Sequence, residues 1–151
     1  MPDKLVIYTD GGARGNPGPA AVGVVFGTPS PSSGHALITS RKSTQQYSEA
    51  IGRTTNNVAE YRAVIFALKK AKSLLGGKTA KEIEVEIRSD SELVVSQLRG
   101  EYKIKEENLK PLFLEAWNLK QDFKSVIFTL IPREENKLAD KLVNRALDTL
   151  L

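Results

Sequence analysis

The 151-residue sequence contains no cysteine and only one histidine, His35. The lack of cysteine excludes disulfides, thiolate nucleophiles and zinc sites built on sulfur. A single histidine cannot form a histidine-rich metal centre. Any metal in this protein must therefore be held by oxygen ligands, which favour hard cations such as Mg²⁺ or Mn²⁺.

Long apolar runs are also missing. Residues 20–26 form one of the longest, far short of the roughly 20 residues that cross a bilayer, and no secretory signal is visible. We therefore expect a cytoplasmic protein without membrane contact. Hydrophobic residues make up 40% of the chain and charged residues 26%, which is typical of one globular domain, here residues 1–151. A net charge of +4 and a pI near 9.3 mildly favour a polyanionic partner.

The order of the expected elements indicates an α/β fold, with three strands first and then helices alternating with two further strands. Expected strands cover residues 5–9, 20–26, 82–90 and 125–131, with a third strand centred on residues 46–51 inside 35–52. Helices are expected over residues 58–75, 93–98, 109–120 and 136–151. Residues 27–34 are expected to form a loop. We also expect Leu74, Leu138 and Leu150 on the apolar faces of their helices, and Trp117 in a buried or half-buried core position rather than stacked on a base.

Four acidic residues lie where these elements meet, and each has a structural explanation of its own. Asp10 begins a Gly-rich turn, and Asp90 could cap the helix that follows its strand. Glu60 follows Asn57 at the spacing of a capping box, and Asp140 suits the dipole of the last helix. Their joint placement points further, because parallel strands bring their carboxyl ends to one sheet edge, where ligands of open α/β sheets bind.

Four like charges cannot gather without compensation, since each raises the pKa of its neighbours. With neither histidine nor cysteine available as a ligand, such a cluster predicts one or two Mg²⁺ ions. Two ions about 3.5–4 Å apart stabilise both the attacking water and the leaving oxygen in phosphoryl displacement. The site therefore favours hydrolysis of a phosphodiester by activated water.

Four blocks that each contain one of these acids resemble the type 1 ribonuclease H family: YTDGGARGNPGPA, TNNVAEYRAVIFAL, RSDSELVVSQLRGEYKIK and IPREENKLADKLVNRAL. The resemblance implies a five-stranded mixed sheet flanked by helices. It implies Asp10, Glu60, Asp90 and Asp140 as catalytic and metal-binding residues, with two Mg²⁺ ions (or Mn²⁺) in the substrate complex. It also implies cutting of the RNA strand of RNA–DNA hybrids, leaving 5′-phosphate and 3′-hydroxyl ends. We expect the protein to be a monomer.

The resemblance also implies substrate contacts, some of which suit recognition of the 2′-hydroxyl that separates RNA from DNA. The expected substrate-binding residues are Gly11, Gly12, Asn16, Thr55, Asn57, Ser91 and Arg133. For Asn57, a helix-capping role is compatible with substrate contact.

Three departures from the family pattern affect substrate binding. Arg133 stands where many relatives have a loop histidine, and it cannot transfer a proton. Glu92 replaces a frequent glutamine. Residues 100–124 contain five lysines and five acids, so the basic protrusion of some relatives is missing. Hybrid binding is then expected to depend on Lys103, Lys105 and the lysines of residues 69–81. A DNA nuclease of the same fold and a non-catalytic nucleic-acid-binding module remain as alternatives.

Overall fold

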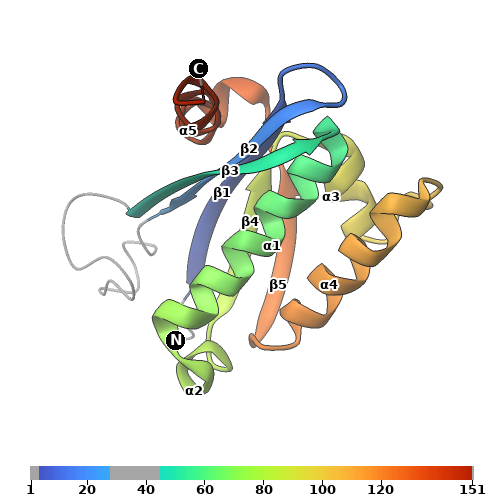
Figure 1. Ribbon diagram of the computed structural model, residues 1–151. Helices are drawn as coiled ribbons and strands as arrows, with labels where there is room; N and C mark the ends of the chain where they lie inside the picture. Colours follow the sequence, from blue (N-terminus) through green and yellow to red (C-terminus); the bar gives the residue numbers. More distant parts are fainter. Residues whose placement is uncertain (1–3, 28–44, 151) are drawn as a thin grey trace.

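The computed structural model describes residues 4–27 and 45–150, and its centre is a five-stranded sheet (Figure 1). The strands are β1 (Lys4–Ala13), β2 (Gly18–Phe26), β3 (Gln45–Thr54), β4 (Glu84–Ser89) and β5 (Ser125–Leu130). Their order across the sheet is β3-β2-β1-β4-β5. β2 is antiparallel to both β1 and β3, whereas β4 is parallel to β1 and to β5. The predicted α/β class with a five-stranded mixed sheet is confirmed.

Helices cover both faces of this sheet. They are α1 (Asn56–Leu75), α2 (Gly77–Ala80), α3 (Glu92–Leu98), α4 (Lys110–Lys120) and α5 (Lys137–Asp148), with short 3₁₀ turns at Glu107–Leu109 (η2) and Arg133–Glu135 (η3). α1 packs on β1 and β2 from one side, and α5 packs on β2 and β3 from the other (Figure 1). Among the described residues, no helix is both long and apolar enough to span a membrane.

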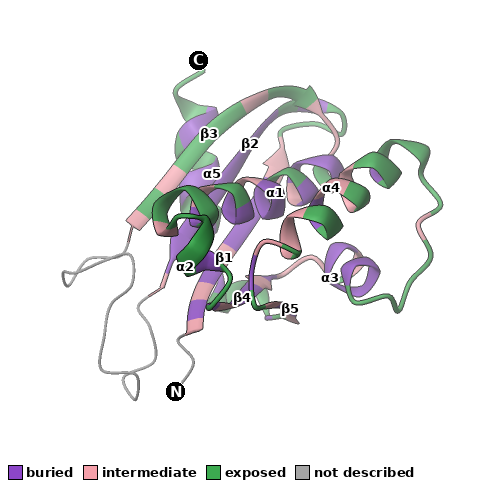
Figure 2. Ribbon diagram, turned by 90° about the horizontal axis from the view of Figure 1, so that it is seen from below, coloured by how far each residue is buried: buried purple, intermediate pink, exposed green. Residues whose placement is uncertain are grey.

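The main core lies between the sheet and α1. Leu5 and Ile7 of β1 alternate with more exposed residues, as expected for a strand with one buried face. Buried residues on α1 recur every three or four positions, which makes one continuous apolar stripe. A smaller apolar layer joins α5 to the opposite face of the sheet. The edge strand β3 is mostly exposed along its length (Figure 2).

Several sequence expectations need correction. The predicted third strand exists, but β3 is longer than its expected centre, and α1 begins two residues before the predicted start. Residues expected on apolar helix faces or in the core are instead exposed by 40% or more: Leu74, Trp117, Leu138 and Leu150. Helical spacing alone marks a broad apolar stripe, whereas packing buries only the part that meets a neighbour. The expected loop residues 28–34 and His35 lie outside the described residues.

Trp117 is the clearest of these corrections. Its ring stacks on Phe113 with the centroids 5.7 Å apart, on an outward side of α4. The ammonium of Lys120 lies 3.9 Å from the centroid of the same ring. Trp117 therefore covers part of the surface of α4 with aromatic and cation–π contacts.

Candidate active site: an acidic cleft at the sheet edge

Asp10 and Asp90 come together because two parallel strands stop pairing at the same level. The register of β1 and β4 ends with Tyr8 opposite Arg88. Two further steps along both strands place Asp10 beside Asp90. β1 itself continues to Ala13 through its pairing with β2. Asp10 therefore lies within a strand that extends past its parallel neighbour, and not at the strand end that the sequence predicted.

Glu60 reaches this edge because α1 approaches β1 very closely at Gly11. A Cβ atom at Gly11 would lie 2.1 Å from the carbonyl oxygen of Ala59, so only glycine fits there. The backbone N–H of Gly11 donates to Oε1 of Glu60 at 3.0 Å. Oxygen atoms of Asp10, Glu60 and Asp90 all lie within 4.8 Å of one another. The three acids thus form one compact group of carboxylates.

The alternative capping roles of Glu60 and Asp90 are both wrong. α1 is capped by Thr55, whose hydroxyl accepts from the N–H of Val58 at 3.3 Å. α3 is capped by Ser91, whose hydroxyl accepts from the N–H of Val94 at 3.2 Å. Ser91 directly follows Asp90, and Thr55 lies two positions before Asn57. The carboxylates of Glu60 and Asp90 therefore remain directed to the cleft.

Asp140 lies in the first turn of α5, as predicted. α5 is held close to the sheet at Gly23, where a Cβ atom would lie 2.3 Å from the carbonyl oxygen of Ala139. The Asp140 carboxyl interacts with that of Asp10, although it lies outside the compact group of three. A cleft of about 360 Å³ is lined by all four acids together with Gly11, Gly12 and Arg133.

The cleft is lined by more acidic than basic side chains, so negative charge is in excess. Burial, followed by the negative charges of Asp90 and Asp140, raises the pKa of Asp10 to about 8. Burial and the charges of Asp10 and Asp90 raise the pKa of Glu60 well above its usual value, against the opposing effects of the Gly11 N–H and the Arg133 charge. Carboxyl groups that resist ionisation in this way are candidates for a functional site. An all-carboxylate set of donors also fits a hard divalent cation, whose charge would offset the repulsion.

Comparison with known proteins agrees with this geometry. The family described as reverse transcriptase-like matches residues 8–146. Ribonuclease HI of Halobacterium salinarum is 39% identical over 96% of this chain and 65% of its own length. The crystal structure of LC11-RNase H1 in complex with RNA/DNA hybrid superposes with a TM-score of 0.82 at 44% identity, covering 97% of this chain and 98% of that one.

The chain belongs to the type 1 ribonuclease H family. Bifunctional protein Rv2228c of Mycobacterium tuberculosis is a further relative, 41% identical over 96% of this chain. The chain spans about a third of the length of that protein, 36%. Enzymes of the ribonuclease H family depend on metal ions, and the group Asp10, Glu60 and Asp90 is able to hold one.

The remaining residues expected to bind substrate lie outside the acidic cleft. Asn16 uses its side-chain oxygen to accept from the N–H of Asn56 at 3.0 Å. Asn57 donates to Oε1 of Glu106 at 3.3 Å. Thr55 and Ser91 cap helices, as described above. Glu92 accepts a hydrogen bond from the hydroxyl of Tyr102, so its carboxylate already has a partner within the protein.

Sequence reasoning missed four polar residues that organise the acidic cleft. Asn56 accepts from the N–H of Ala13 at 2.8 Å and so ties the β1–β2 turn to the start of α1. The buried Asn136 donates to the carbonyl of Thr9 at 2.8 Å and to Oδ2 of Asp90 at 3.3 Å. The other two are Arg14 and Asn144. Only Asn144 could have been recognised from the sequence, because a residue four positions after Asp140 lies on the same face of the helix.

Proposed function

We propose that this chain is a metal-dependent endoribonuclease that hydrolyses the RNA strand of RNA–DNA hybrids and leaves 5′-phosphate and 3′-hydroxyl ends. The observation that carries this proposal is the convergence of four carboxylates from β1, α1, α5 and the end of β4 in one cleft. The likeness to LC11-RNase H1, solved with an RNA/DNA hybrid, supports the choice of substrate.

The proposed ligands of Mg²⁺ are Asp10, Glu60, Asp90 and Asp140. Mn²⁺ is the alternative ion. Two ions are proposed to bind in the substrate complex. Bound ions would supply the positive charge that activates a water and stabilises the leaving oxygen. The chain itself keeps the ligands in place before any ion binds. The Gly11 N–H holds Glu60, and the Asn136 amide holds Asp90.

Recognition of the hybrid is proposed to involve the β1–β2 turn and the start of α1. Gly11 and Gly12 present backbone close to the acids, and Asn16 retains an amide group that can donate to a ribose. Arg133 lines the cleft and faces Glu60 as a fixed positive charge. It is proposed to bind a phosphate oxygen near the cut, as an electrostatic partner rather than a proton carrier.

The positive charges proposed to hold the rest of the hybrid are Lys103 and Lys105. Both are exposed, and within the described part of the chain neither makes an ion pair. They line a hollow of about 590 Å³ next to α3. By contrast, Lys69 pairs with Glu115 at 2.9 Å and Lys72 with Asp122 at 3.2 Å. These two lysines already have acidic partners, Glu115 on α4 and Asp122 just after it.

Cleavage of matched substrates in Mg²⁺ tests the proposal. RNA–DNA hybrid, double-stranded RNA, single-stranded RNA and double-stranded DNA are each incubated with the wild type and with Asp10→Asn. Hybrid cutting that needs Mg²⁺ and is lost in the variant is the expected result. No cutting of any substrate would reject the proposed activity and favour a binding module. Cutting that is indifferent to Asp10 would reject the proposed site. Two further expectations, a cytoplasmic location and a monomeric state, are tested by cell fractionation and by light scattering.

A further inference from the structure

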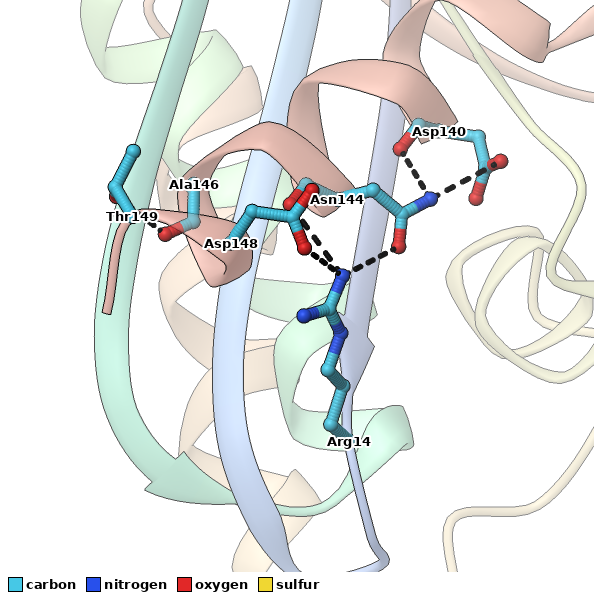
Figure 3. A network of polar contacts seen from close by, with 6 residues as sticks. All are labelled: Arg14, Asp140, Asn144, Ala146, Asp148 and Thr149. Carbon is cyan, nitrogen blue, oxygen red and sulfur yellow. Dashed lines mark hydrogen bonds and ion pairs between the residues drawn. The ribbon is translucent and has the colours of Figure 1, made fainter. Parts of the chain in front are cut away.

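A chain of polar contacts joins the β1–β2 turn to α5 beside the acidic cleft (Figure 3). Nη2 of Arg14 lies 2.7 Å from Oδ1 of Asp148. The same nitrogen donates to the side-chain oxygen and to the carbonyl oxygen of Asn144, each at 3.4 Å. The amide nitrogen of Asn144 then donates to the carbonyl oxygen of Asp140 at 3.1 Å and to its Oδ2 at 3.5 Å.

The chemistry of the two neighbours leaves one orientation for the Asn144 amide. A guanidinium only donates hydrogen bonds, so it requires the amide oxygen on its side. An ionised carboxylate only accepts, so it requires the amide NH₂ on the other side. The contact with Asp148 holds the guanidinium at the far end of the series. Asp148 therefore orients the guanidinium of Arg14, Arg14 orients the amide of Asn144, and Asn144 orients the carboxylate of Asp140.

Asp140 is the acid that most needs such support. Asp10 is buried, and Glu60 and Asp90 are held by the Gly11 N–H and the Asn136 amide. Asp140 is exposed on the first turn of a helix and lies outside the compact group of carboxylates. An exposed side chain on a helix moves among its staggered rotamers unless a partner selects one. Asn144 is the neighbour on the same helix face that can do so.

A role limited to fastening α5 onto the sheet explains these contacts less well. The helix is already anchored by five buried apolar residues, Ala139, Leu142, Val143, Ala146 and Leu147. An exposed ion pair such as Arg14 with Asp148 adds little to stability. The contacts also end on a carboxylate that faces the cleft, not on the outer side of the helix.

We infer that Arg14 and Asn144 are positioning residues, which hold the carboxylate of Asp140 in the orientation that completes the acidic site. This inference rests on the proposed function, because it assigns a purpose to the orientation of a proposed metal ligand. Neither residue needs to touch the substrate. Asp148 supports them by fixing the guanidinium of Arg14.

The test compares Asn144→Ala, Asn144→Asp and Arg14→Gln with the matched control Arg145→Gln. Arg145 follows Asn144 on α5, is exposed, and makes no side-chain hydrogen bond or ion pair with the described residues. Arg145→Gln therefore removes one guanidinium from α5 without breaking the polar contacts that lead to Asp140. The measurements are hybrid cleavage in Mg²⁺, calorimetric titration with Mn²⁺ alone, and thermal unfolding. Removing an outer partner of a metal ligand costs about 10-fold or more in affinity or rate.

We expect Asn144→Ala and Arg14→Gln to lower kcat and Mn²⁺ affinity about 10-fold, with KM for the hybrid and thermal stability close to those of Arg145→Gln. Asn144→Asp keeps the shape of the side chain but turns a second carboxylate toward Asp140, so we expect it to lower kcat further than the alanine variant. Wild-type kcat and Mn²⁺ affinity in all three variants would overturn the inference. So would a rise in KM alone, which would indicate a substrate contact.

The two proposals fail in distinguishable ways. A wild type that binds Mn²⁺ but cuts no hybrid rejects the proposed function, and the loss of Mn²⁺ affinity in Asn144→Ala then still supports the positioning role. A wild type that cuts hybrid, with variants that match Arg145→Gln in both measurements, rejects the positioning role alone.

Discussion

The backbone N–H of Gly11 and the carboxylate of Glu60 form a hydrogen bond of 3.0 Å between a strand and a helix that start far apart in the chain. The bond exists because β1 and α1 touch backbone to backbone at this point. Gly23 permits the same kind of approach by α5 on the other face. The spacing of the acids is thus set by two glycines that let helices sit directly on the sheet.

Gly11→Ala should separate α1 from β1 and disable the site. The added Cβ would lie 2.1 Å from the carbonyl oxygen of Ala59. Its nearest neighbours are all backbone atoms of α1, so no flexible side chain can move aside. We expect a loss of about 1–3 kcal/mol in the free energy of unfolding, and a fall in hybrid cleavage of about 100-fold as Glu60 moves. Urea unfolding and initial cleavage rates measure the two effects.

Gly12→Ala is the control for stability. Its Cβ would meet only Cγ1 of Val143, at an ordinary 3.6 Å. We expect a change in unfolding free energy well below that of Gly11→Ala. Equal losses in the two variants would show that the close approach at Gly11 does not limit the fold.

Asp10→Asn should stabilise the metal-free protein at high pH. Burial, with the charges of Asp90 and Asp140, raises the pKa of Asp10 to about 8, whereas an unfolded chain ionises aspartate near pH 3.9. Between these values the folded state retains a proton that the unfolded state releases, so stability falls as pH rises from about 4 to about 8. The amide in Asp10→Asn does not ionise, so the variant does not undergo this loss of stability.

Thermal unfolding in chelator at several pH values from 5 to 9 measures the effect. The advantage of Asp10→Asn over the wild type should widen with pH, to a difference on the order of 5 °C at pH 9. Glu107→Gln is a control, because that surface carboxylate is 83% exposed. A gap for Asp10→Asn that stays constant across this range would contradict the raised pKa of Asp10.

Features of the site that neighbouring residues encode were predictable from the sequence, whereas contacts set by the packing of distant elements were not. The four acids were found because strand ends and helix starts are encoded by neighbouring residues, and parallel topology brings them to one edge. The caps were misassigned because Thr55 and Asn57, or Asp90 and Ser91, suit the role almost equally by residue type. Asn136 and Arg14 could not be found, because their partners are set by how α5 docks on the sheet.

Thr55→Ala separates the two roles proposed for this residue. Loss of the cap on α1 should cost about 1 kcal/mol of unfolding free energy, since the hydroxyl no longer accepts from the N–H of Val58. If Thr55 also touches a DNA-strand phosphate, KM for the hybrid should rise in the alanine variant. Thr55→Ser keeps the hydroxyl and should restore both values. A restored stability with KM still raised would show that the methyl group, not the hydroxyl, matters for substrate.

Lys103 and Lys105, rather than Lys69 and Lys72, are expected to hold the hybrid. Lys69 and Lys72 follow Glu60 by nine and twelve residues, so they lie about 14 and 18 Å further along α1, and both are paired with acids. Lys103 and Lys105 are exposed at the hollow beside α3. Each lost phosphate contact should lower the slope of log affinity against log salt by about 0.7–0.9.

Lys103→Gln with Lys105→Gln should therefore reduce that slope by about 1.4 to 1.8. The matched double variant Lys69→Gln with Lys72→Gln should leave the slope unchanged and lower the unfolding free energy by up to about 1 kcal/mol, because two ion pairs are lost, from α1 to Glu115 of α4 and to Asp122 just after α4. Binding measured with Asp10→Asn in the background separates affinity from cleavage. An equal reduction of the slope in both double variants would mean that the ion pairs of Lys69 and Lys72 open to receive the hybrid, and that the charged surface extends along α1 rather than ending at α3.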